Sequence, residues 1–65
     1  MFRMTIKTKK EGYLNYGEIV VYDLASNPDF ILIDFADKTE LYYSKKDIIH
    51  IWVENTEEET ENESN

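Results

Sequence analysis

Few side chains in this sequence have types and spacing suited to catalysis. The chain has no cysteine and one histidine, His50, so it lacks a thiol nucleophile and cannot build a histidine-based metal cluster within one chain. The carboxylates of Asp34 and Asp37 flank an expected turn rather than a pocket. We therefore expect a protein that is not an enzyme and that holds no metal or cofactor.

Binding chemistry is better represented. Asp23 and Asn27 are four residues apart in a polar stretch, where such side chains either bond the backbone of a turn or face a ligand. Turn chemistry alone would explain both residues. The chain's five tyrosines could stack on the bases of single-stranded nucleic acid, although half-buried strands favour tyrosine equally well. The pattern leaves both interpretations open.

The charge distribution argues against strong nonspecific binding to nucleic acid. The 65-residue chain carries a net charge of −7, but residues 54–65 hold six of its 14 acidic residues and no basic ones. Residues 1–53 are therefore close to neutral, and phosphate backbones are usually bound by a clearer positive field. The acidic segment has no apolar residue to bury, so we expect a disordered, solubilising tail. It could also compete for the chain's own lysines or engage another protein.

The elements that would position these residues are five short β-strands. Residues 2–9 alternate apolar and polar side chains, the pattern of a strand with one buried face. Gly12 is expected in a tight turn, and Gly17 to mark a bend inside a long second strand. The other expected elements are strands at 14–24, 30–36, 40–43 and 48–53, with a 3₁₀ turn at 44–47.

The last expected strand has two different faces. Ile49, Ile51 and Val53 would point to the core, which leaves His50 and Trp52 partly exposed on the opposite face. Tryptophan is a preferred interface anchor, and a final strand is an edge that must be covered or paired. A 65-residue domain without disulfides also gains stability from further copies of itself. We therefore predict an oligomer interface at His50, Trp52 and Tyr43.

The stretch from Gly12 to Asn27 resembles a known motif. Gly12 and Gly17 are five residues apart, followed by Ile19, then Asp23, then Asn27. This spacing is similar to the first motif of the Sm and Sm-like proteins, which include the Hfq-related proteins, and covers residues 4–27. The resemblance implies a strongly bent, five-stranded Sm-like or SH3-like barrel that assembles into rings of six or seven copies and binds RNA with its loops.

The resemblance also implies roles for individual residues. Asp23 would brace the loop, and Asn27 would hydrogen-bond a base edge. The base-stacking position falls on Ala25, which has no ring, and the second motif is replaced near Tyr43 and Lys45. The candidate site for RNA or a nucleotide-like ligand comprises Asp23, Asn27, Tyr22, Lys45 and Lys46.

Two hypotheses follow for an all-β protein with a barrel at 1–53 and a tail at 54–65. In the first, a non-enzymatic homo-oligomeric ring binds RNA or a nucleotide-like ligand at loops between subunits. In the second, a small interaction or inhibitor module, of the kind that phages encode, engages another protein through its edge strand or acidic tail. The sequence shows no signal peptide and no membrane-spanning stretch, so a cytoplasmic protein is expected.

Overall fold

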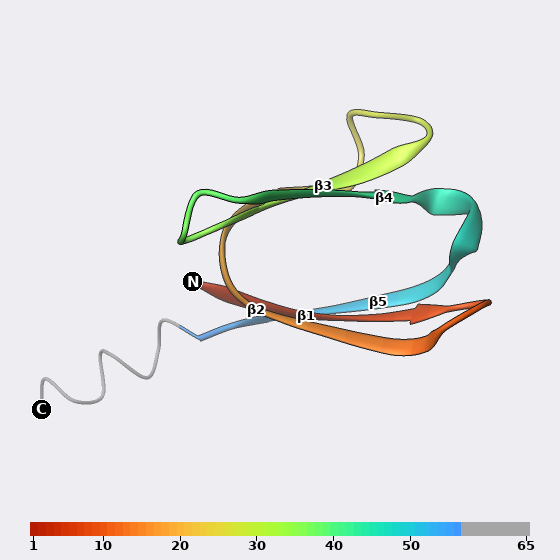
Figure 1. Cartoon of the computed structure of the whole chain (residues 1–65), viewed down its shortest axis with the longest axis horizontal. Helices are drawn as coiled ribbons and strands as arrows, with labels where there is room; N and C mark the ends of the chain where they lie inside the picture. Colours follow the sequence, from red (N-terminus) through yellow and green to blue (C-terminus); the bar gives the residue numbers. More distant parts are fainter. Residues whose placement is uncertain (57–65) are drawn as a thin grey trace, which may run out of the picture.

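The computed structural model describes residues 1–56, which form five β-strands and one 3₁₀ turn (Figure 1). The strands belong to a single antiparallel sheet with the order β4-β3-β2-β1-β5. In chain order the elements are β1 Phe2–Thr8, β2 Gly12–Asp23, β3 Phe30–Phe35, β4 Glu40–Ser44, η1 Lys45–Asp47 and β5 Ile48–Asn55.

The sheet is strongly bent, and the bend lies in the middle of β2. The first half of β2 pairs with β1, and its second half pairs with β3, so the sheet folds into the two layers visible in Figure 1. The left-handed backbone conformation at the bend belongs to Glu18, with φ of 55°, and not to Gly17. The Glu18 carbonyl accepts a bond of 2.9 Å from the Ala36 amide, which fixes the bend against the end of β3.

The predicted closure into a barrel is not observed. The strand order ends at β4 on one side and β5 on the other, and within residues 1–56 no register pairs these two strands. Between them, η1 carries the chain from the layer of β4 to the layer of β5 (Figure 1). The structure is therefore an open, bent sheet with two unpaired edges.

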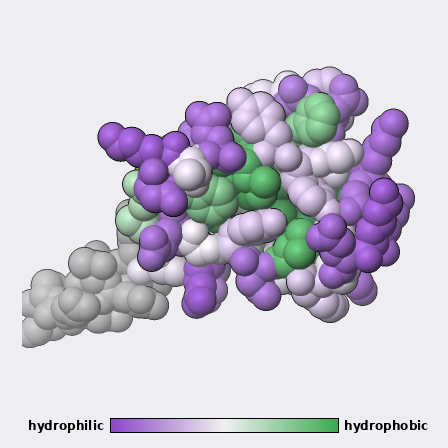
Figure 2. All heavy atoms as spheres, viewed as in Figure 1, coloured by the Kyte–Doolittle hydropathy of each residue, from purple (hydrophilic) through white to green (hydrophobic). Residues whose placement is uncertain are grey.

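The core fills the space between the two layers. Its fully buried apolar side chains are Met4, Ile6, Ile19, Ile31 and Ile33. These residues come from alternating positions of β1 and β3 and from β2 just after the bend, and the buried face predicted for the first strand is confirmed. Figure 2 shows apolar atoms gathered in the middle of the molecule and polar residues around them.

The predicted inward face of the last strand is confirmed only at Ile51. Val53 is 37% exposed and Ile49 is 53% exposed, whereas Ile48 and Ile51 both pack against the core. At Ile49 the cause is a β-bulge, because the register with β1 passes from Lys7 opposite His50 to Thr8 opposite Ile48. Ile49 is the extra residue, left without a partner on β1.

The last strand also extends further than predicted. Glu54 and Asn55, expected in the acidic tail, form the end of β5 and pair with Arg3 and Phe2. The remainder of the predicted tail, 57–65, lies outside the described residues. Among residues 1–56, no helix is long and apolar enough to span a membrane.

Candidate functional site

The loop between β2 and β3 uses its polar side chains to hold its own backbone. The Asp23 carboxylate accepts bonds of 3.0 Å from the amides of both Ala25 and Ser26. These bonds hold the pKa of the Asp23 carboxyl below its usual value, and the bond from Ser26 has the largest effect. The nearby charge of Lys45 lowers this pKa further. This carboxylate therefore braces the loop, as the turn interpretation predicts.

Asn27 acts in the same way at the other end of the loop. Its side-chain oxygen accepts bonds of 2.8 Å from the Asp29 amide and 3.1 Å from the Phe30 amide. Such bonds are the usual reason for asparagine in a turn. The acceptor atom of Asn27 is thus committed to the backbone, and its NH₂ group is the part that can address a ligand.

The structure brings the predicted lysines to this loop. The backbone amide of Lys45 donates a 2.8 Å bond to the Asp29 carbonyl, so η1 lies against the loop at the same end of the molecule (Figure 1). Lys46 is the more exposed of the two lysines, and its amide bonds the Ser44 hydroxyl at the start of the 3₁₀ turn. This end therefore carries two cations beside the braced loop.

Tyr22 was predicted at the ligand site and Tyr43 at the oligomer interface. Both side chains are partly buried against the core. The Tyr22 ring meets the Phe2 ring edge-on, at 5.1 Å between centroids. The Tyr43 hydroxyl donates a hydrogen bond to Asp47. Both rings have internal partners, in contrast to the exposed rings of Tyr13 on β2 and Trp52 on β5.

His50 and Trp52 lie on the outside of the layer formed by β2, β1 and β5, together with a tyrosine that the sequence did not single out. The His50 and Trp52 rings are 4.4 Å apart, and the Tyr13 ring lies 6.2 Å from Trp52 on the other side of β1. Tyr13 is 58% exposed and Trp52 is 48% exposed. Aromatic rings this exposed are free to contact a partner.

Register places polar side chains between and beside these rings. Lys7 of β1 lies between Tyr13 and His50, and its Nζ is 5.5 Å from the centroid of the tyrosine ring. Thr5 lies between Asn15 and Trp52 in the next row. We call this surface the aromatic face, and its residues are Arg3, Thr5, Lys7, Tyr13, Asn15, His50, Trp52 and Glu54.

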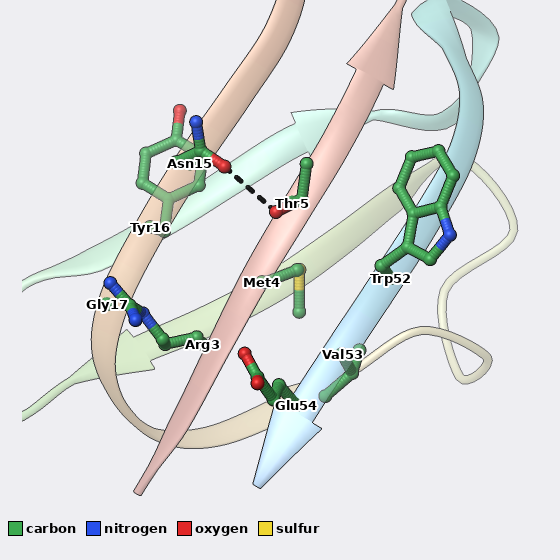
Figure 3. Close-up of a pocket in the computed structure, with 9 residues that line it drawn as sticks. All are labelled: Arg3, Met4, Thr5, Asn15, Tyr16, Gly17, Trp52, Val53 and Glu54. Atoms are coloured by element: carbon green, nitrogen blue, oxygen red, sulfur yellow. Dashed lines mark hydrogen bonds between the residues drawn. The ribbon is translucent and has the colours of Figure 1, made fainter. Parts of the chain in front are cut away.

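A hollow of about 570 Å³ opens at one end of the aromatic face (Figure 3). Arg3, Glu54 and Trp52 line it from β1 and β5. On the β2 side it is bounded by Asn15, whose side-chain oxygen accepts a 2.8 Å bond from the Thr5 hydroxyl. Gly17, which has no side chain, completes this side. The result is a shallow site with one tryptophan wall and charged groups of both signs.

The sequence contained part of the signal for this site. His50 and Trp52 were expected to share an outward face, and they do. Tyr13 and Lys7 join them only through the pairing of β1 with both β2 and β5, which connects residues far apart in the chain. Glu54 was missed because it was assigned to the tail.

No protein-family model, curated protein or solved structure matches this chain. Residues 1–56 also hold no group of three or more histidine, aspartate or glutamate side chains that could bind a metal ion. The candidate site is therefore defined by its own geometry, an aromatic surface with interspersed cations and a hollow at one end.

Proposed function

We propose that the protein is a non-enzymatic binding protein for single-stranded RNA, and that the aromatic face is its main binding surface. The observation that carries the proposal is the exposed pair Tyr13 and Trp52, with the Lys7 ammonium beside the tyrosine ring. Bases stack on flat exposed rings, and lysines between the rings meet the phosphates.

Charge supports this surface over the rest of the sheet. Arg3 and Lys7 lie on the outward side of β1, and Lys9 and Lys10 follow in the turn to β2. Four of the chain's seven basic residues are thus concentrated in one strand and its turn. A polyanion would meet a locally positive strip although the whole chain is acidic.

Fluorescence tests the proposal directly, because Trp52 is the only tryptophan in the chain. A base stacked on Trp52 should quench its emission when a short oligouridine or oligoadenosine is titrated. Tyr13→Ala should weaken binding by about 5-fold to 150-fold, since base–aromatic stacking contributes roughly 1–3 kcal/mol per base. Tyr42→Ala is the matched control, because Tyr42 is also 58% exposed but belongs to the other layer. Equal effects of the two variants would contradict the proposal.

The two open edges favour self-association as a further part of the proposed function. An unpaired strand edge is a template for another strand, and β5 also exposes Ile49 at its bulge. Pairing β4 of one copy with β5 of the next is a head-to-tail contact that can close into a ring. The loop end with Asn27, Lys45 and Lys46 would then recur around that ring as a second contact for RNA.

Light scattering after gel filtration tests the assembly. We expect a mass several times that of the 7.8 kDa chain, and Ile49→Lys should reduce it, because a lysine on an edge strand opposes strand addition. A monomeric wild type would contradict the ring. The second hypothesis, a module that engages another protein, rests on the same open β5 edge, and a monomer that binds no oligonucleotide would favour it.

A further inference from the structure

The hollow beside Gly17 has a composition that a general stacking surface does not need. Arg3 and Glu54 are register partners on β1 and β5, so their side chains start from neighbouring points on the aromatic face. Trp52 forms the adjoining wall. Figure 3 shows Arg3 reaching toward Gly17 and Glu54 lying on the β5 side of the same space. A ligand in this hollow would therefore contact one positive and one negative side chain.

Gly17 keeps the hollow open. A Cβ built on Gly17 would meet no atom within 4 Å, and the left-handed conformation of the bend belongs to the next residue, Glu18. Neither packing nor a positive φ therefore requires glycine at position 17. A glycine inside a strand marks a bulge, a sharp bend or a close approach of a ligand to the backbone, and Gly17, beside the bend of β2, leaves room for such an approach.

Glu54 is the informative residue, because a carboxylate repels phosphates and is a poor choice on a surface that binds a polyanion. It becomes favourable when it accepts hydrogen bonds from a base. Guanine is the base whose Watson–Crick edge presents two adjacent donors, N1–H and the N2 amino group, and these match the two oxygens of one carboxylate. Uracil, cytosine and adenine each place an acceptor beside their donor, and a carboxylate would repel that acceptor.

Arg3 complements the same base. Arginine donates two bonds to guanine O6 and N7, on the edge next to the one that a carboxylate would bind. Trp52 can stack on the ring while the two charged groups hold its edges. We propose that the hollow lined by Arg3, Glu54, Trp52 and Gly17 is a guanine-selective pocket. This inference rests on the proposed binding of single-stranded RNA by the aromatic face.

Short oligonucleotides with one variable position test the pocket. The affinities of UUUGUU, UUUAUU, UUUCUU and UUUUUU would be measured with the full chain by fluorescence anisotropy. We expect the guanine hexamer to bind at least ~10-fold more tightly than the others, within the range of one good bidentate contact. Replacing guanine with inosine, which lacks only the N2 amino group, should remove most of that preference.

Two variants separate the pocket from the surface around it. Glu54→Gln should abolish the preference for guanine over inosine while the all-uridine hexamer binds as tightly or more tightly. Glu40→Gln, an exposed carboxylate of β4 in the other layer, should change neither quantity. Equal binding of all hexamers, with Trp52 still quenched, would overturn the guanine pocket and leave the proposed function standing. Absence of binding to every hexamer would overturn the proposed function itself.

Discussion

The hydroxyl of Tyr43 donates a 2.5 Å hydrogen bond to the Asp47 carboxylate across η1. The other oxygen of Asp47 accepts the Lys10 amide at 3.2 Å, and the Asp47 carbonyl accepts the Lys9 amide at 2.8 Å. Asp47 therefore ties the 3₁₀ turn to the β1–β2 turn, which lies in the other layer (Figure 1). In a sheet that is not closed, this contact holds the two layers together at the η1 end.

Stability should depend on pH through this pair. The Tyr43 hydrogen bond, with smaller effects from Lys10 and Lys9, holds the pKa of Asp47 below the ordinary 3.8, and the bond to Asp47 raises the pKa of Tyr43 to about 12. The contribution of Asp47 to the free energy of unfolding is present above pH 3.8 and is lost as the pH falls through the pKa of Asp47 in the folded protein. The tyrosine's contribution is present below pH 10 and is lost as pH rises through about 12.

Tyr43→Phe tests this dependence. The variant should be less stable than the wild type at neutral pH, and the difference should shrink at both extremes, where the wild type loses the same bond. Urea denaturation between pH 2 and 12 measures it, and Tyr42→Phe, at an exposed position, is the control. A difference that stays constant with pH would show that the lost hydroxyl acts through packing alone.

The two glycines should respond in opposite ways to alanine. Gly12 has φ of 77°, where an L residue is strained, so Gly12→Ala should lower the free energy of unfolding by about 1–2 kcal/mol. Gly17 has open space around its missing side chain, so Gly17→Ala should raise it by about 0.4–1 kcal/mol. Urea midpoints of the two variants measure both changes. A destabilised Gly17→Ala would show that the bend itself needs glycine.

The bulge in β5 makes another matched pair. Ile33 is fully buried and Ile49 is 53% exposed, although both are isoleucines in strands. Ile33→Val should cost about 0.5–1.5 kcal/mol, because it removes one buried methylene and leaves a cavity. Ile49→Val should change stability by no more than about 0.5 kcal/mol, as expected for an exposed position. Similar losses in thermal denaturation, measured at concentrations where the protein is monomeric, would place Ile49 in the core.

Much of the fold could be predicted because alternation is a local signal. The inward positions Met4, Ile6 and Ile19 follow from apolar residues two apart and from the bend after Gly17. The bulge could not be predicted, since Ile48 and Ile49 are the same residue type and the choice between them depends on pairing with β1. Barrel closure likewise depends on whether β4 and β5 meet, and no local pattern encodes that contact.

The candidate site was less predictable for the same reason. The turn interpretation of Asp23 and Asn27 is confirmed, because the side-chain oxygens of both residues accept hydrogen bonds from the backbone of the loop that follows β2. The aromatic face assembles residues from three strands, and Tyr13 meets Trp52 only because β1 pairs with both of their strands. Sequence spacing carries little information about such a three-strand surface.

If RNA crosses the aromatic face, its affinity should depend on salt through individual cations. Each phosphate contact on a single strand adds about 0.7 to the slope of log affinity against log salt concentration. Lys7→Gln should therefore weaken binding of an oligouridine and lower the slope by about 0.7, because Lys7 lies between the stacking rings. Lys38→Gln, in the turn between β3 and β4, should leave the slope unchanged. Anisotropy titrations between 50 and 200 mM salt measure both slopes. If Lys38→Gln changed the slope as much as Lys7→Gln, the RNA would have to contact both layers, and the path across β1 would be wrong.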